Sequence, residues 1–340
     1  MTHTLDRWLR QAHQLQASDL HLSAGLPPMA RVHGELQSLQ TQVLSQPQLC
    51  ELLHSFVPDW NNAQDHDCAV DWPELGRCRV NVFAQARGWS SVWRLIPSQV
   101  PTLAAIAAPT QLLDWVRHPH GLVLVTGATG SGKSTTLAAL LHHLNTTQAL
   151  HILTLEDPIE FVHTSQRSLV QQRSVPGHSA SFETALRAAL RQDPDVILVG
   201  ELRDLPTVRL ALSAAETGHL VLASLHTRSA TQAVERLIDV FPSEDKALVR
   251  QQLSLSLVGV LTQTLCRRAD GQGRVAAHES LVATPAVRNL IRESKTAQLP
   301  NVLQTGAQQG MHTLAQSLGG LVAQGLISAA EASKIQPSHI

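Results

Sequence analysis

The sequence predicts an α/β fold in which a mostly parallel sheet is preceded by a smaller α+β domain. Four short apolar runs in the second part of the chain alternate with stretches of helical spacing, at residues 122–125, 151–155, 196–199 and 220–225. Such runs are typical of strands that are buried on both faces of a parallel sheet. The length of 340 residues favours two domains, since one domain usually takes about 100–200 residues.

The first part of the chain has the pattern of a mixed α+β domain. A helical spacing covers residues 1–12, and strand patterns follow at residues 19–22, 29–32, 78–83 and 91–96. Residues 97–109 then carry three prolines, many alanines and few charges, which favours a linker. We therefore predict an N-terminal domain at 1–97, a linker at 98–110 and a second domain at 111–340.

Helices are expected between the buried strands of the second domain. Helical spacing covers residues 135–144, 180–191 and 206–217. Asp193-Pro194 ends the second of these helices, and Gly218 ends the third. The last hundred residues look mainly helical, which predicts a helical C-terminal part.

Composition argues against nucleic-acid binding and membrane insertion. The 26 basic and 27 acidic side chains give a net charge of -1, so no bulk positive field attracts a polyanion. Aromatic residues make up 3% of the chain, without tyrosine, which leaves few faces for base stacking. The four cysteines form no C-x-x-C pair, and no window is apolar over the ~18 residues that a membrane helix needs. We expect a cytoplasmic protein with no integral membrane segment and no nucleic-acid partner.

A glycine-rich segment follows the first apolar run of the second domain. Residues 127–134 fit the phosphate-loop pattern G-x-x-x-x-G-K-[ST], between an expected strand and an expected helix. Glycines let several backbone N–H groups face one anion, and the helix adds the positive end of its dipole. Lys133 is expected to reach the β- and γ-phosphates of ATP, and Ser134 to bind Mg²⁺ through its hydroxyl. The predicted nucleotide-binding residues are Gly127, Ala128, Thr129, Gly130, Ser131, Gly132, Lys133, Ser134 and Thr135.

Carboxylates follow two of the apolar runs. Residues 154–160 contain Glu156, Asp157 and Glu160, and Glu201 ends the run at 196–199 after Gly200. Phosphoryl transfer to water needs a water held in line and a metal held still, and carboxylates at strand ends can do both. Many such strands carry Asp at the place of Gly200, so contact of Glu201 with the metal through a water is expected. A single acid would be better explained as an N-cap, a salt bridge or a solvated turn. Two acids at strand ends, in a chain with a phosphate loop, favour a functional role.

Two histidines flank the fourth apolar run. His219 precedes residues 220–225 and His226 follows them, so both imidazoles are expected near the ends of a strand. A histidine there can hydrogen-bond a γ-phosphate or a neighbouring acid. Because the chain has 18 histidines, ordinary turn positions explain either residue equally well.

Taken together, these segments closely resemble the PilT-like type IV pilus retraction ATPases of the secretion ATPase superfamily. The resemblance covers nearly the whole chain and is carried by residues 17–23, 127–134, 154–161, 193–204, 216–227 and 286–293. It implies a PAS-like N-terminal domain before a RecA-like P-loop ATPase domain with a helical C-terminal part. It also implies a ring of six subunits that binds ATP between neighbours.

The resemblance also implies roles for single residues. Glu160 matches the family's water-activating glutamate, and Glu201 matches its Walker B glutamate, here also an expected metal ligand. His219 and His226 match its histidine box. Departures from the family pattern, such as Ala128 where the loop usually has Pro, remove no reacting group.

Two arginines of the N-terminal domain complete the candidate site. Arg79 and Arg94 match arginines that approach the nucleotide in similar ATPases, where a guanidinium can neutralise charge in the transition state. Both are equally compatible with ordinary positions at a strand edge. The implied partners are five further copies of the chain and an inner-membrane pilus platform protein, with a second retraction ATPase left open. The implied location is cytoplasmic, at the periphery of the inner-membrane pilus machine.

Three other functions stay open at this point. The assembly and secretion relatives carry a longer N-terminal extension and usually a tetracysteine zinc module, and the sequence shows neither, which favours retraction. A noncatalytic accessory subunit would not need Lys133, Glu160 and Glu201, which are all present. A nucleic-acid motor is disfavoured by the neutral charge and the scarce aromatics.

Overall fold

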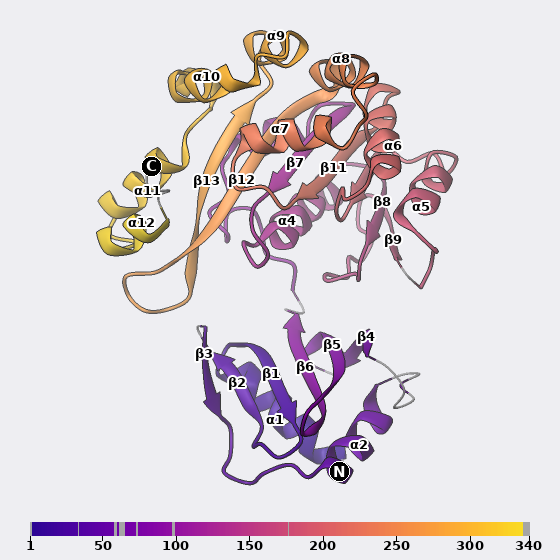
Figure 1. Ribbon diagram of the computed structural model, residues 1–340, viewed down its shortest axis with the longest axis vertical. Helices are drawn as coiled ribbons and strands as arrows, with labels where there is room; N and C mark the ends of the chain where they lie inside the picture. The colour runs from indigo at the N-terminus through magenta and orange to yellow at the C-terminus, as the bar shows by residue number, and fades with distance from the viewer. Residues whose placement is uncertain are drawn as a thin grey trace. The chain divides into compact units, whose positions relative to one another are not determined.

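The computed structural model describes residues 2–32, 34–57, 60, 65–72, 74–96, 99–175 and 177–335. The chain forms two compact units (Figure 1). The first comprises Met1–Gln99 together with Glu160–Val162, and the second comprises Val100–Ile159 and His163–Ile340. The predicted linker, residues 98–110, therefore belongs to the second unit from Val100 onward, and its role as a linker stays a prediction.

The first unit contains an antiparallel sheet in the order β3-β2-β1-β6-β5-β4. Two helices pack on it through a core in which Leu9, Leu20, Leu53 and Trp93 are fully buried. The first helix and four of the strands lie where the sequence predicts them. The elements are α1 (Thr2–Gln14), β1 (Ala17–Ser23), β2 (Met29–Val32), β3 (Glu35–Ser38), α2 (Gln46–Phe56), β4 (His66–Trp72), β5 (Gly76–Gln85) and β6 (Gly88–Ile96).

Three elements of the first unit were not predicted. Strand β3 is exposed along its whole length, so no apolar alternation marks it. Strand β4 is mostly half-buried, which weakens the same signal. Helix α2 does have a sequence signature, because Ser45 and Gln48 form a capping box at its start.

The second unit is built on a sheet of seven strands in the order β13-β12-β7-β11-β10-β8-β9. All neighbours are parallel except β12 and β13, so the prediction of a mostly parallel sheet is confirmed. The four predicted strands correspond to β7, β8, β10 and β11. The strands are β7 (Gly121–Thr126), β8 (His151–Glu156), β9 (Leu169–Ser174), β10 (Val196–Val199), β11 (Leu220–Leu225), β12 (Leu257–Arg267) and β13 (Arg274–Val282).

Helices cover both faces of this sheet (Figure 1). Alternate residues of β7 separate the two layers, since Leu122 and Leu124 pack with α5 to α10 and Val123 and Val125 pack with α3 and α4. The helices are α3 (Gln111–Trp115), α4 (Lys133–Thr147), α5 (Phe182–Ala189), α6 (Leu205–Glu216), α7 (Ala230–Asp239), α8 (Lys246–Ser256), α9 (Pro285–Arg292), α10 (Leu299–Thr305), α11 (Leu314–Ala323) and α12 (Ala329–Ile335).

The last hundred residues contain more than the predicted helices. Strands β12 and β13 form a long antiparallel hairpin at the edge of the sheet, and α11 and α12 pack on it through Cys266, Val275 and Leu318. The apolar residues of β12 directly follow those of α8, so the local pattern reads as one continuing helix. The long hairpin was therefore missed.

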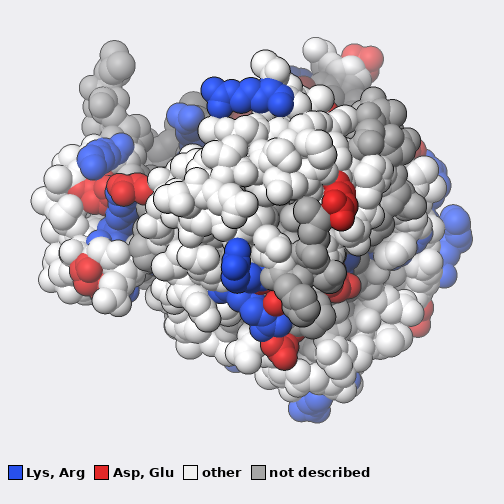
Figure 2. Space-filling view, turned by 90° about the horizontal axis from the view of Figure 1, so that it is seen from below, with Lys and Arg blue, Asp and Glu red and all other residues white. Residues whose placement is uncertain are grey.

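The described residues contain no membrane helix, and the face drawn in Figure 2 has no basic stripe among its described residues. Among the described residues, no helix combines the length and the apolar character needed to cross a bilayer. On the face shown in Figure 2, the described charged side chains form small groups of both signs among uncharged residues. A groove that follows a nucleic-acid backbone needs a continuous positive surface, and the described residues of this face offer none.

Candidate nucleotide-binding site

The glycine-rich loop lies at the carboxyl edge of the parallel strands. Strands β7, β11, β10 and β8 are parallel neighbours, so their last residues meet at one edge of the sheet. Strand β7 ends at Thr126, and α4 begins at Lys133 after a left-handed Gly132 with φ of 90°. The predicted order of strand, loop and helix is thus confirmed. Residues 128–130 are exposed, so the loop and the start of α4 are open to an anion.

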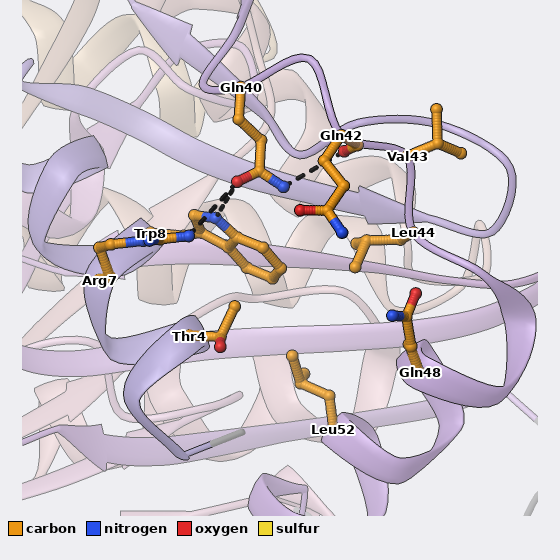
Figure 3. Close-up of a pocket in the computed structure, with 9 residues that line it drawn as sticks. All are labelled: Thr4, Arg7, Trp8, Gln40, Gln42, Val43, Leu44, Gln48 and Leu52. Atoms are coloured by element: carbon orange, nitrogen blue, oxygen red, sulfur yellow. Dashed lines mark hydrogen bonds between the residues drawn. The ribbon is translucent and has the colours of Figure 1, made fainter.

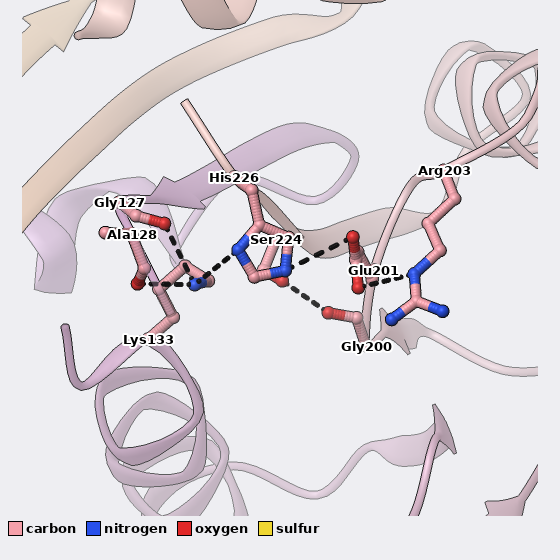
Figure 4. A network of polar contacts seen from close by, with 8 residues as sticks. All are labelled: Gly127, Ala128, Lys133, Gly200, Glu201, Arg203, Ser224 and His226. Carbon is pink, nitrogen blue, oxygen red and sulfur yellow. Dashed lines mark hydrogen bonds and ion pairs between the residues drawn. The ribbon is translucent and has the colours of Figure 1, made fainter. Parts of the chain in front are cut away.

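The side chain of Lys133 is folded against the loop in this structure. Its ammonium donates to the carbonyl oxygens of Gly127 at 2.9 Å and Ala128 at 3.0 Å, and lies 3.3 Å from Nδ1 of His226 (Figure 4). An ammonium has no lone pair, so Nδ1 of His226 accepts and the ring proton of a neutral imidazole sits on Nε2. The contact therefore fixes the tautomer of His226.

Glu201 continues this chain of contacts. One of its carboxylate oxygens lies 3.2 Å from Nε2 of His226, and the other accepts from Nε of Arg203 at 2.7 Å. Lys133, His226, Glu201 and Arg203 thus form one connected line across the carboxyl ends of β7, β11 and β10 (Figure 4). The line joins the phosphate loop to the Walker-B-like strand.

Gly200 has a steric reason for its identity. A Cβ built on it would lie 3.1 Å from the carbonyl oxygen of Leu155 and 3.3 Å from Cα of Glu156. The amide of Gly200 donates to the same Leu155 oxygen at 2.7 Å, so β10 and the end of β8 are drawn together here. An aspartate at this position would press against the backbone of β8, which explains its absence.

A hollow of about 370 Å³ opens beside this line of contacts. Two arginines and a histidine in its wall make it suitable for an anion. The buried hydroxyl of Thr227 has no hydrogen-bond partner among the described residues. The wall is formed by Glu201, Leu202, Arg203, Leu225, His226, Thr227 and Arg236.

Magnesium fits the oxygen donors at this edge. Ser134 is exposed on the first turn of α4, and Glu201 offers carboxylate oxygens at the end of β10. Mg²⁺ prefers few protein oxygens and completes its octahedron with water and phosphate. Both Glu201 oxygens already have partners, so contact through a water is easier than direct ligation. Among the described residues, no group of three His, Cys, Asp or Glu side chains would hold a metal by itself.

The two predicted histidines lie at opposite ends of β11. Leu220 pairs with Gly121 and Leu225 pairs with Thr126, so His226 is at the loop edge and His219 is at the far edge. Six strand residues separate them, which is about 20 Å. Nδ1 of His219 lies 3.1 Å from the carbonyl oxygen of Ala214 at the end of α6. Of these two histidines, His226 is the one beside the loop, 3.3 Å from the ammonium of Lys133.

The remaining predicted residues belong to the first unit. Glu160 is half-buried and belongs to the short segment Glu160–Val162 of that unit. Arg79 on β5 pairs with Asp67 on β4 at 2.8 Å, and Arg94 on β6 pairs with Asp19 on β1 at 3.0 Å. Each arginine is thus neutralised within its own sheet, and the roles of these three residues stay predictions.

Another hollow, of about 180 Å³, lies in the first unit (Figure 3). Nε1 of Trp8 donates to the side-chain oxygen of Gln40 at 3.2 Å, and the amide of Gln40 donates to the carbonyl oxygen of Gln42. Its wall carries one charged side chain, Arg7, among the residues that line it. This composition suits a triphosphate far less than the hollow beside Glu201 does.

Comparison with known proteins identifies the family. Residues 79–272 match the family model described as "Type II/IV secretion system protein". The chain is 53% identical over 317 residues to "Type IV pilus retractation ATPase PilT" of Pseudomonas aeruginosa, covering 92% of each chain. This chain belongs to the type II/IV secretion system protein family. It is also 50% identical over 306 residues to a "Twitching motility protein" of Neisseria gonorrhoeae, covering 88% of this chain and 82% of the relative.

Solved structures of two ATPases have the same fold. The structure titled "Crystal Structure of the Pilus Retraction Motor PilT and Bound ADP" matches with a TM-score of 0.87 and 40% identity, over 97% of this chain and 96% of the other. The ATPase DotB of Legionella pneumophila matches with a TM-score of 0.86 and 31% identity, over 97% and 94% of the two chains. The predicted fold class, a RecA-like ATPase domain preceded by a smaller domain, is thereby confirmed.

Two polar residues of this site were not predicted from the sequence. Arg203 stands two residues after Glu201, and its ion pair with that acid has no local signature. Gln263 on β12 bonds to both the loop and α4, but its strand was not predicted. The position of β12 beside β7 is a property of the sheet order.

Proposed function

We propose that this protein is an ATP-hydrolysing motor that powers type IV pilus retraction as a homo-hexamer. The observation that carries the proposal is the connected line from Lys133 through His226 to Glu201 at the phosphate loop. Strong similarity to a pilus retraction ATPase over nearly the full chain supports it. Similarity to a retraction motor with bound ADP supports ATP as the nucleotide.

Each residue of the site has its own role in phosphoryl transfer. Loop amides and Lys133 would hold the phosphates. Ser134 and, through a water, Glu201 would hold Mg²⁺, which would supply positive charge to the phosphate oxygens. Glu160 orients and activates the attacking water. His226 connects Glu201 to the γ-phosphate side of the loop. These are the roles that the family resemblance implies, and the chemistry of each residue suits its role.

The ring and its partners complete the proposal. Arg79 and Arg94 would contribute positive charge to a nucleotide between neighbouring subunits, exchanging their present carboxylate partners. Domain rotation at residues 98–110 would then convert hydrolysis into movement of the pilus platform protein at the inner membrane. A strictly monomeric protein with and without an ATP analogue would contradict this arrangement.

Steady-state ATP turnover by the purified protein tests the catalytic part. Wild type should turn over ATP, and Lys133→Gln and Glu201→Gln should reduce turnover at least about 100-fold. Lys246→Gln is the matched control, because its ammonium pairs with Asp239 at the end of α7 and touches no loop residue. Wild-type turnover at background level would favour the accessory role. Deletion in the native host should leave surface pili abundant and unable to shorten, and a host without pili would contradict retraction.

A further inference from the structure

The side chain of Gln263 on β12 bonds both to the phosphate loop and to helix α4, which follows it. Its side-chain oxygen accepts from the hydroxyl of Thr136 on α4 at 2.9 Å. Its side-chain nitrogen donates to the carbonyl oxygen of Ser131 in the loop at 2.7 Å. Because a carbonyl oxygen can only accept, the amide orientation is settled by Ser131.

The amide of Gln263 is enclosed as well as bonded. Gln263 is 1% exposed and Thr136 is 3% exposed, so water does not compete for these bonds. Thr262 pairs with Thr126, the last residue of β7, so Gln263 stands directly beside the start of the loop. Buried polar groups are retained only with their partners satisfied, and loss of one partner is costly.

Gln263 leaves no room for a side chain at two of the motif glycines. A Cβ on Gly127 would lie 2.4 Å from the backbone oxygen of Gln263, and a Cβ on Gly132 would lie 2.9 Å from its side-chain nitrogen. A Cβ on Gly130 would meet nothing within 4 Å, so glycine is favoured there by its positive φ of 77° and not by lack of space. The loop is therefore packed closely against β12 at Gly127 and Gly132 and bonded to it at Ser131, whereas Gly130 has open space around it.

We propose that Gln263 is a positioning residue that sets the phosphate-binding shape of the loop. Its side-chain oxygen and nitrogen are bonded to the Thr136 hydroxyl and the Ser131 carbonyl, so it acts through these two groups. Fixing Ser131 to β12 and α4 holds the second half of the loop in one arrangement, which avoids an ordering cost when nucleotide binds. This inference rests on the proposed function only in taking the loop as the nucleotide site.

The test compares ADP binding by full-length variants, measured by calorimetry. Gln263→Leu removes both bonds and leaves the Ser131 carbonyl buried without a partner, so the Kd for ADP should rise about tenfold. Thr136→Val removes one bond and should raise it about threefold. In turnover assays, KM for ATP should rise similarly while kcat changes less than about threefold, because the loop grips ground state and transition state alike.

A buried amide at the other end of α4 supplies the matched control. The side chain of Asn145 is 1% exposed, donates to the carbonyl oxygen of Thr164 at 2.8 Å and accepts from the amide of Gln166 at 2.9 Å. Asn145→Leu should lower the thermal unfolding midpoint as much as Gln263→Leu does and leave the Kd for ADP unchanged. This contrast separates positioning of the loop from general stability.

Each outcome decides the inference. If Gln263→Leu does not fold, Thr136→Val still carries the test. Folded variants of both residues that bind ADP like wild type would overturn it, as would an Asn145→Leu protein that loses ADP affinity equally. Wild type that fails to bind ADP would overturn both proposals, whereas wild type that binds ADP without hydrolysing ATP overturns only the proposed function.

Discussion

The ammonium nitrogen of Lys133 lies 3.3 Å from Nδ1 of His226, so the loop lysine and the histidine after β11 are direct partners. The other ring nitrogen of His226 faces Glu201 at 3.2 Å. A phosphate that binds the loop competes with His226 and two carbonyl oxygens for the ammonium of Lys133. Nucleotide binding can therefore be communicated to Glu201 by the exchange of one hydrogen bond.

Replacing His226 should separate catalysis from binding. His226→Phe keeps a ring of similar size and removes both nitrogens, so Lys133 loses one partner and Glu201 keeps only Arg203. We expect ATP turnover to fall about 10- to 100-fold while the Kd for ADP changes little. Turnover and ADP calorimetry on the same preparation check this, and wild-type turnover would show that the histidine is dispensable.

The histidine at the other end of β11 should behave differently. His219→Gln disturbs a contact with Ala214 at the far edge of the sheet, so turnover should change less than about twofold. The measurement is the same steady-state assay. A loss as large as that of His226→Phe would mean that His219 acts on a nucleotide held by another subunit.

Glycine at position 200 should be required by sterics. Gly200→Ala and Gly200→Asp both place a Cβ 3.1 Å from the Leu155 oxygen, so both should cost about 1–3 kcal/mol of unfolding free energy. Chemical denaturation of both variants checks this. If Gly200→Asp alone is destabilised, the charge and not the Cβ is the cause.

The parts of the site that were predictable are those with local patterns. The apolar runs of β7, β8, β10 and β11 predicted a parallel sheet, and the glycine pattern predicted the loop between β7 and α4. The direction of β11 relative to the loop also follows from parallel pairing. The separation of His219 from His226 could therefore have been predicted from the sequence. The position of Gln263 could not have been predicted. It lies beside Gly127 because β12 is next to β7 in the sheet, and no local sequence pattern indicates that strand order.

Two buried histidines should make the fold sensitive to acid. Burial lowers the pKa of His163 to about 4 and the pKa of His278 to about 4. Their unfolded pKa is about 6.5, so the unfolded state binds more protons between these values and stability falls as the pH falls through that window. Each histidine should cost about 2 kcal/mol of unfolding free energy between pH 7 and pH 5.

A variant without one of these groups isolates the effect. His278→Phe should reduce the loss of stability between pH 7 and pH 5 by about 2 kcal/mol, compared with wild type under the same denaturant titration. His120→Phe is the control, because this exposed histidine is already solvated in the folded chain. Equal pH dependence in wild type and His278→Phe would contradict the assignment.

Arg288 should stabilise the packing of α9 on α8. Its guanidinium donates to the carbonyl oxygens of Ser254 at 2.7 Å, Leu255 at 2.6 Å and Ala283 at 2.9 Å. These contacts satisfy carbonyl groups at the end of α8 and fix α9 against it, and burial lowers the pKa of Arg288.

Lysine cannot reproduce that geometry. A planar guanidinium reaches three acceptors from two nitrogens, whereas an ammonium is a compact point charge, so Arg288→Lys should cost about 1–2 kcal/mol of unfolding free energy. Arg292→Lys on the same helix is the matched control, because Arg292 is half-exposed and bonds only to neighbours on or next to its own helix. Denaturant titration of both variants checks the contrast. Equal stability of the two would mean that the three carbonyl contacts of Arg288 contribute nothing that water does not replace, and that α9 is held on α8 by Val287 and Ile291 alone.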